Sequence, residues 1–397
     1  MDKRNRILLL KISSAALILL VLLSFTSLSC GNSELRAEVV GRWEYSFPPG
    51  LDDVPNFEYE PECGLIDAYP ITSAEIDGKG YLILGFPPRS SAYNSCFFIF
   101  DTENPLSPRL ISTIKPEKQG SIGGMINNSA VCDDILYSCL FGDNGLWMVD
   151  ISDPANPVDL GIAPVEVTSN IIVSGDYAYA SGQMYDGVTI MDISDTQDVR
   201  EINRIDLSTR EHCLAVAGEH LYVGIKQTLT IFDISNPASP KNIGTCELVL
   251  TEGLVGELPF YTGEIHWANW ASIINIEASG DYVYLTFGAG QVKIIDVSDP
   301  KSPREAADID LGGFAINLTL KDNYLYVTKS DAETQLLQFC IVDVSEPEKP
   351  EIMYSVATES IFGFGGASLA YMWARPQVMG DYVYIAGINY MDIVEIK

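Results

Sequence analysis

The sequence predicts an all-β fold made of seven copies of one unit, and three observations support this. An acidic residue ends a short apolar run at a recurring interval, at Asp101, Asp150, Asp192, Asp233, Asp296, Asp343 and Glu395. A Gly/Asp/Asn turn followed by a run rich in Tyr and Val precedes each copy. No stretch of useful length has the periodicity of an amphipathic helix. Such repetition indicates one supersecondary unit stacked on copies of itself.

Each unit reads as four short antiparallel strands. A first strand such as Asn170–Ser174 leads into a tight turn and a Tyr-rich second strand, which is a hairpin signal. The third strand is apolar at consecutive positions, as in Trp147-Met148-Val149, which fits a strand buried on both faces. A fourth strand follows the Asp-Pro turn, as at Arg109–Ile114. Blades packed face to face around an axis bury their middle strands in this way, so the sequence predicts a β-propeller.

The strand count predicts how the ring closes. Seven second strands and seven third strands are present, and the last unit stops at its third strand, Tyr390–Lys397. The segment Gly41–Phe47 can supply the missing fourth strand and remove an exposed edge. We therefore predict seven blades of four strands, with the last blade closed by the N-terminal strand.

The N-terminus is typical of an export signal. Basic residues precede the apolar run Ile12–Phe25, which is short for a membrane span, and small residues follow. The ending Leu28-Ser29-Cys30-Gly31 resembles a bacterial lipoprotein signal, although Ser27 stands where that family favours Leu. The resemblance implies that Cys30 is lipidated; a plain secretory cleavage and an uncleaved anchor are the alternatives. We expect a signal peptide at 1–29, a tether at 30–40, the propeller at 41–397, and an anchor at the outer membrane or cell surface.

The repeat itself points to a family. The runs Ile341-Val-Asp-Val344 and Ile294-Ile-Asp-Val297, with their counterparts, resemble the LVIVD repeat of bacterial and archaeal surface proteins. The resemblance spans roughly residues 41–397, and the last copy departs from it with Glu395 in place of Asp. It implies a propeller fold and an extracytoplasmic setting. The family carries no agreed catalytic residues to transfer.

Charge narrows the range of partners. The net charge is −30, and removing residues 1–29 takes it to about −33, because four basic residues and one acidic residue are lost. So acidic a surface repels nucleic acid, and we expect no nucleic-acid partner. The chain has eight cysteines, of which Cys63 and Cys96 are the pair to test first for a disulfide.

The repeated acidic residue of the third strand favours a structural role over metal binding. Asp followed by Ser and then Asp-Pro or Asn-Pro is turn chemistry, in which the carboxylate accepts backbone N–H bonds and Pro fixes φ. No Cys/His spacing suggests zinc, and the acidic clusters lack the spacing of a calcium loop. We expect no metal and no cofactor, with calcium as the open alternative.

Three long connections are candidates for binding: Pro48–Asp67, Leu248–Asn269 and Thr358–Pro376. They belong to the two classes of connection that emerge on one face of a propeller, and long loops on a rigid scaffold often carry function. Their aromatic and basic side chains resemble a recognition surface, although they could instead pack over the ring mouth. The candidate ligand-binding residues are Tyr261, His266, Trp267, Trp270, Tyr371, Trp373 and Arg375.

Asparagine recurs at one position of the first strand. Five residues before the first turn of each unit stand Ala74, Asn128, Asn170, Cys213, Asn275, Asn317 and Arg375. Asn is unfavourable in a strand, so its repetition asks for a reason. The sequence predicts a partial polar ring, Asn128, Asn170, Asn275 and Asn317, lining a central channel. The competing interpretation is that each amide satisfies nearby backbone groups.

Catalytic signals are sparse. The chain has three histidines and none of the nucleophile-elbow, zinc-protease or phosphate-loop motifs, so no catalytic residue is assigned. The leading hypothesis is a surface-anchored propeller that binds a protein or glycan through its long-loop face without covalent chemistry. The alternative is an exported polysaccharide hydrolase or lyase with acidic residues at the channel mouth.

Overall fold

A computed structural model of the chain describes residues 37–44, 69–86, 96–117, 125–141, 145–167, 170–181, 186–207, 213–250, 272–288, 290–330, 336–361, 375–386 and 390–397. All of them belong to the compact unit Leu35–Lys397. These ranges contain strands and turns without any helix, and hence none long and apolar enough to cross a membrane. The prediction of an all-β fold is confirmed.

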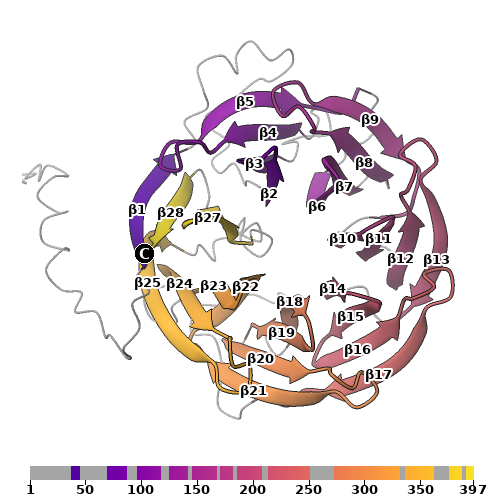
Figure 1. Cartoon of the computed structure of the whole chain (residues 1–397), viewed down its shortest axis with the longest axis vertical. Helices are drawn as coiled ribbons and strands as arrows, with labels where there is room; N and C mark the ends of the chain where they lie inside the picture. Colours follow the sequence, from indigo (N-terminus) through magenta and orange to yellow (C-terminus); the bar gives the residue numbers. More distant parts are fainter. Residues whose placement is uncertain are drawn as a thin grey trace, which may run out of the picture. The chain divides into compact units, whose positions relative to one another are not determined.

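The strands form seven four-stranded antiparallel sheets, which Figure 1 shows arranged as blades around a common centre. Blade one contains β2 (Tyr69–Ile76), β3 (Lys79–Phe86), β4 (Cys96–Asp101) and β5 (Arg109–Ile114). Blade two contains β6 (Met125–Cys132), β7 (Ile135–Phe141), β8 (Gly145–Asp150) and β9 (Val158–Ala163). Blade three contains β10 (Asn170–Ser174), β11 (Tyr177–Ser181), β12 (Gly187–Asp192) and β13 (Arg200–Asp206). In each blade the strands are hydrogen-bonded in this order from the centre outward.

The other four blades repeat this plan. Blade four contains β14 (Cys213–Ala217), β15 (His220–Ile225), β16 (Thr228–Asp233) and β17 (Lys241–Glu247). Blade five contains β18 (Ile273–Ser279), β19 (Tyr282–Phe287), β20 (Gln291–Asp296) and β21 (Arg304–Asp310). Blade six contains β22 (Phe314–Lys321), β23 (Tyr324–Ser330), β24 (Leu336–Asp343) and β25 (Glu351–Ile361). Blade seven contains β26 (Gln377–Met379), β27 (Tyr382–Ala386), β28 (Tyr390–Ile396) and β1 (Ala37–Glu44).

The core lies between the blades. Each pair of neighbouring blades shares one hydrophobic cluster, and the cluster between blades seven and one completes the circuit with Leu84, Phe98 and Tyr384. On β8, Trp147 packs toward blade one while Met148 packs toward blade three. Successive side chains of a strand point to opposite faces, so a strand between two neighbours needs apolar residues at every position. This explains the continuous apolar runs of the third strands.

The N-terminal strand closes blade seven, as predicted. β1 pairs antiparallel with β28, from Ala37 opposite Ile396 to Glu44 opposite Tyr390. Its register shifts at Val40, and the third and fourth strands of the other six blades have a bulge at the equivalent step. β1 therefore has the geometry of a regular fourth strand. It begins at Ala37 rather than at Gly41, four residues earlier than predicted.

The repeated acidic residues shape the turns, which confirms their structural interpretation. In six blades the Asp that ends the third strand accepts, through Oδ1, the backbone N–H two residues further on, at 2.8–3.1 Å. The fourth strand then begins with an Arg in several blades, and Arg200 pairs with Asp192 at 3.1 Å. The motif that defines the repeat is thus a turn cap.

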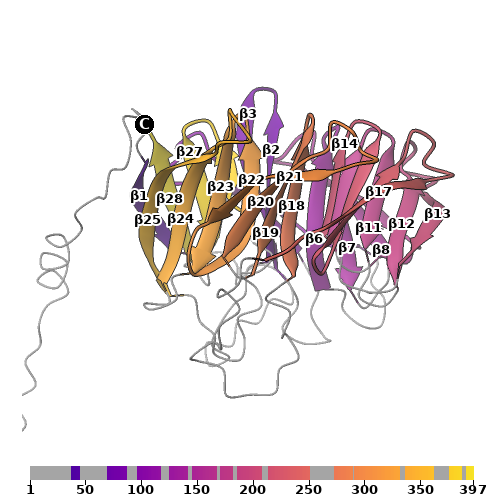
Figure 2. The same cartoon turned by 90° about the horizontal axis from the view of Figure 1, so that it is seen from below.

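The strands run between the two faces of this unit, as the side view in Figure 2 shows. At one face, here called the turn face, the first and second strands are joined by two-residue turns, and the Asp-capped turns join the third and fourth strands. The opposite face, called the loop face, receives the connections between second and third strands and between successive blades. These vary in length: Lys226–Gln227 alone joins β15 to β16, whereas residues 248–272 join β17 to β18.

Two details of the sequence interpretation change. The first turn of blade one is Asp77–Gly78, two residues earlier than the repeat alignment implied, and both residues have positive φ (52° and 73°). Ala74 consequently pairs with Tyr81 beside the turn and does not occupy the position of the asparagines. Cys96 is a free thiol, as are the other cysteines of the described ranges, whereas Cys63 lies outside these ranges.

Candidate functional site

The four asparagines lie on innermost strands and bond to one another in pairs. Nδ2 of Asn128 on β6 donates to Oδ1 of Asn170 on β10 at 2.8 Å, which joins blades two and three. Nδ2 of Asn275 on β18 donates to Oδ1 of Asn317 on β22 at 2.9 Å, which joins blades five and six. Oδ1 of Asn275 also accepts the N–H of Ile276 at 2.7 Å. The amides therefore link neighbouring blades sideways, and backbone satisfaction is a secondary role.

Burial separates the two amide pairs. Asn275 and Asn317 are 3% and 2% exposed, and Asn170 is 6% exposed, whereas Asn128 is half-buried. Blade four has Cys213 at the equivalent position, and its thiol donates to the carbonyl of Ile274 at 2.9 Å. A buried hydrogen bond between neutral groups stabilises a fold modestly, but losing one partner is costly. This level of the innermost strands is therefore a polar seam between blades.

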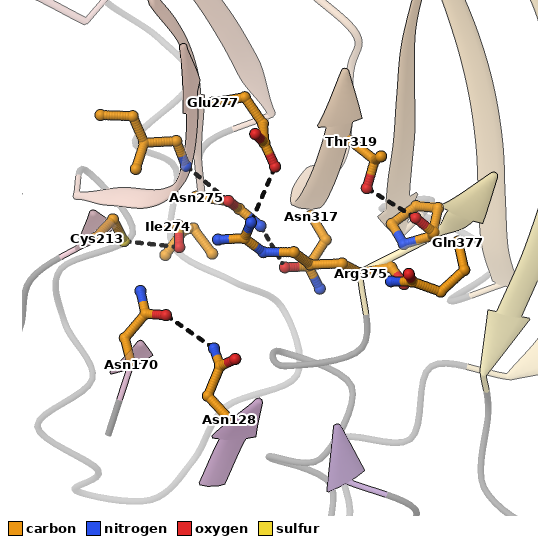
Figure 3. Close-up of polar contacts among 12 residues, drawn as sticks. Asn128, Asn170, Cys213, Ile274, Asn275, Glu277, Asn317, Thr319, Arg375 and Gln377 are labelled. Atoms are coloured by element: carbon orange, nitrogen blue, oxygen red, sulfur yellow. Dashed lines mark hydrogen bonds and ion pairs between the residues drawn. The ribbon is translucent and has the colours of Figure 1, made fainter. Parts of the chain in front are cut away.

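An ion pair crosses this seam. Nη1 of Arg375, just before β26 in blade seven, lies 2.9 Å from Oε1 of Glu277 on β18 in blade five. The pair passes blade six, because blades five and seven are not neighbours. Figure 3 shows the Arg375 side chain extending toward Glu277, with the Asn275–Asn317 pair in the same group. Both ionic side chains are about one-quarter exposed, at 28% and 27%.

Burial raises the pKa of the Glu277 carboxyl group, and the nearby Arg375 guanidinium opposes this rise. Partial exclusion of water therefore destabilises the ionised form of Glu277 unless the Arg375 guanidinium is paired with it. The sequence reasoning missed Glu277. It could have been found as an acidic residue in an otherwise mostly apolar strand, two places after Asn275 and therefore on the same strand face.

Further polar contacts hold Arg375 in place. Oγ1 of Thr319 on β22 donates to the carbonyl of Pro376 at 2.7 Å. Nε2 of Gln377 donates to the carbonyl of Arg375 at 3.0 Å, and Oε1 of Gln377 accepts from the Ser73 hydroxyl of blade one at 2.9 Å. We call this group the central polar cluster: Asn275, Glu277, Asn317, Thr319, Arg375 and Gln377.

The cluster lies along the middle of the innermost strands. Asn317 stands five residues before the hairpin turn of its blade, whereas Glu277 pairs with Tyr284 and stands only three residues before the hairpin turn at 280–281. Arg375 immediately precedes β26. The other candidate ligand-binding residues (Tyr261, His266, Trp267, Trp270, Tyr371, Trp373), like the predicted lipidation site Cys30, lie outside the described residues. Arg375 is therefore the member of the predicted ligand-binding set that the structure places.

The described groups allow hydrogen bonding and charge recognition. On the described innermost strands the acidic residues are Glu75 in blade one and Glu277 in blade five. Glu75 is exposed and pairs with Gly80 beside the hairpin turn, whereas Glu277 pairs with Tyr284 and contacts Arg375. Within the described ranges no three His, Cys, Asp or Glu side chains gather to hold a metal ion. The expectation about calcium stays a prediction for a binding experiment.

Solved structures with a similar fold have diverse origins. A computationally designed protein, Ika8, aligns with 84% of this chain and 96% of its own, at a TM-score of 0.52 and 10% identity. The Pseudomonas aeruginosa periplasmic gluconolactonase aligns with 72% of this chain and 84% of its own, at a TM-score of 0.53 and 11% identity. A Lactobacillus plantarum protein gives a TM-score of 0.55 at 10% identity, over 72% of this chain and 84% of its own. Identities this low establish the shared fold alone.

Sequence comparison identifies the family. No functionally curated protein matches the chain. The LVIVD repeat matches at residues 137–163, 167–206, 212–247, 273–310, 312–358 and 377–396. These segments cover more than half of the sequence and coincide with blades two to seven. The chain belongs to the LVIVD repeat family.

Proposed function

We propose that this chain is an exported, membrane-anchored binding module that recognises a protein or glycan through its loop face. The observation that carries the proposal is the sorting of connections between the two faces. Every connection of variable length joins strand ends at the loop face, whereas the turn face carries short, repeated turns. Variable connections on a rigid scaffold are the usual place for recognition.

The anchor part of the proposal rests on the sequence before β1. Basic residues, the apolar run Ile12–Phe25 and the cysteine at position 30 fit an export signal followed by lipidation. Ala37 is opposite Ile396, so β1 begins at the turn face. A tether that joins the chain at this end leaves the loop face available to a ligand.

The test compares a loop-face variant with a turn-face variant. The chain from residue 31 onward is produced without lipid, and residues 255–268 are replaced by a short Gly-Ser linker in one variant. The matched control carries Asp322→Asn at a turn-face hairpin, where Asn tolerates the positive φ of 53°. Pull-downs from cell-envelope extracts and a glycan array are read for all three proteins after circular dichroism has checked their folding.

Loss of binding in the 255–268 variant with retention in Asp322→Asn is the expected result. Equal binding by all three proteins would remove this connection from the recognition surface. Binding lost in Asp322→Asn alone would place the recognition surface on the turn face and contradict the proposal.

One observation favours the alternative, an exported polysaccharide hydrolase or lyase. The raised pKa of Glu277 is the direction that a general acid requires. Glycosidases ordinarily use two carboxyl groups, and the described innermost strands carry Glu277 in blade five and, beside the hairpin turn of blade one, the exposed Glu75. Incubation with polysaccharides, followed by chromatography of the products, tests this alternative. Turnover that is abolished in Glu277→Gln would establish it.

A further inference from the structure

We propose that Arg375 is the receptor for a ligand carboxylate, so that the central polar cluster binds an acidic glycan by exchanging Glu277 for a uronic-acid group. The inference rests on the proposed binding function and specifies its ligand class. It depends on the ion pair that crosses the ring from blade seven to blade five.

Arg375 has donor capacity for a second carboxylate. A guanidinium carries five N–H donors in a planar fork that matches a carboxylate with two parallel bonds. Within the described ranges its recorded side-chain contact is the bond from Nη1 to Glu277. Its side chain is 28% exposed, so the guanidinium is within reach of solvent. Some of the guanidinium N–H donors are therefore available to a ligand carboxylate.

Glu277 is an exchangeable partner for this guanidinium. The pair spans two blades without the short connection that fixes the Asp and Arg residues of the turn face. Desolvation disfavours the ionised form of Glu277 and the Arg375 charge opposes this, so Glu277 takes up a proton when a ligand carboxylate takes over the guanidinium. A ligand carboxylate that takes its place keeps the guanidinium neutralised.

The surroundings favour a sugar acid over an acidic peptide. Around Arg375, blade six supplies a hydroxyl group from Thr319 and an amide from Asn317, and blade seven itself supplies the amide of Gln377. A uronic acid presents hydroxyl groups beside its carboxylate, which suits such polar neighbours. A peptide side chain would need apolar contacts to compensate for its ordering, and the cluster offers few of them.

The test uses a panel of uronic-acid oligosaccharides together with their methyl esters, which keep the shape and lose the charge. Calorimetry with the delipidated chain is expected to give affinity at least about tenfold higher for the acid than for the ester. Arg375→Gln is expected to remove this preference, and Arg375→Lys to retain part of it, because a lysine offers charge without the fork. Glu277→Gln is expected to raise affinity by about threefold or more, since it removes the competing charge.

Glu277→Gln is expected to raise the affinity and Arg375→Gln to lower it. A loss of folding would lower the affinity of both variants, so opposite changes distinguish recognition from misfolding. The inference is overturned if no acidic oligosaccharide in the panel binds, if acid and ester bind equally, or if Arg375→Gln leaves affinity unchanged. If a neutral glycan or a protein still binds through residues 255–268, the proposed function stands and only this ligand class falls.

Discussion

Asn275 donates from Nδ2 to Oδ1 of Asn317 at 2.9 Å, and this bond joins the innermost strands of two neighbouring blades. Both side chains are almost fully buried. Thr286 lies directly across from Asn275 in the same blade, and its buried hydroxyl has no recorded hydrogen-bond partner among the described residues. The seam between blades five and six is therefore polar in an otherwise apolar interface.

The first prediction concerns this seam. Asn275→Ala removes both amide bonds of Asn275 from a buried site, and we expect the free energy of unfolding to fall by about 1–3 kcal/mol. Asn128→Ala is the matched control in the half-buried pair, where water can replace the lost bond, so its effect should be smaller. Denaturant titration measures both. Equal stability of Asn275→Ala and the unmodified chain would show that the amide pair contributes nothing.

The second prediction concerns ring closure. A protease site introduced between residues 45 and 68 allows the chain to be cut between β1 and β2. We expect the β1 fragment to stay bound under native conditions, because it pairs with β28 and buries Ala37 and Val39 between blades six and seven. Size-exclusion chromatography with mass spectrometry follows the fragment.

Ala37→Asp provides the contrast for this cleavage experiment. Ala37 is 3% exposed, and a carboxylate there would be buried without compensation, so the cut fragment should be released. Glu38→Asn alters an exposed neighbour and should leave retention unchanged. Release of the unaltered fragment as readily as the Ala37→Asp fragment would show that β1 does not close the ring.

The third prediction is a pH dependence of stability. Hydrogen bonds from the serine two residues ahead, first from its hydroxyl and then from its backbone N–H, lower the pKa of Asp192, Asp233 and Asp296 below 3.8. A carboxyl group with a lowered folded pKa stabilises the fold fully above its unfolded pKa, and this stabilisation is lost as pH falls through the folded value. The melting temperature should therefore fall as the pH drops below about 4.

Asp296→Asn should flatten the acid limb of this profile, because the amide keeps an acceptor for the turn but cannot titrate. Asp322→Asn removes one charge at a turn-face hairpin outside these caps and should leave the shape of the profile unchanged. Calorimetric scans between pH 7 and pH 3 compare the three proteins. A profile of Asp296→Asn that is parallel to that of the unmodified chain would contradict the assignment.

The fourth prediction concerns the anchor. Cys30→Ser removes the thiol that lipidation requires, so the exported chain should move from the membrane fraction to the soluble fraction and should not incorporate labelled palmitate. Immunoblots of fractionated cells measure the first result and click labelling measures the second. Membrane association that survives without label would favour the uncleaved anchor over lipidation.

The sequence was sufficient to predict the scaffold because its signals are repeated and local. The continuous apolar third strands indicate a neighbouring blade on each side, and Asp followed by Ser indicates a capped turn. The number of blades and the order of their strands could therefore be predicted. The start of β1 could not be predicted so closely, because its alternation from Ala37 to Val39 is short and a bulge at Val40 interrupts it.

The candidate site was less predictable, because its contacts are not periodic. The repeat pattern identified Asn275 and Asn317 and placed Arg375 at the equivalent position of its own blade. An alignment of repeats shows which residues are equivalent, but it does not show which side chains contact one another across the ring. The pairing of Arg375 with Glu277 passes over a whole blade, and no property of either residue in sequence specifies it. The position of Ala74 was predicted wrongly for a similar reason. The first hairpin of blade one is longer than in the other blades, so its turn does not fall where the repeat alignment places it.

Hydrogen exchange of the chain with and without its captured ligand tests the central claim, recognition through the loop face, most directly. The account predicts slower exchange on binding at the strand ends of that face, around residues 272–275, 311–315 and 375–376. The turn-face hairpins at 175–176, 280–281 and 322–323 should exchange at unchanged rates. Slower exchange at those hairpins, with none at the loop-face strand ends, would contradict the account.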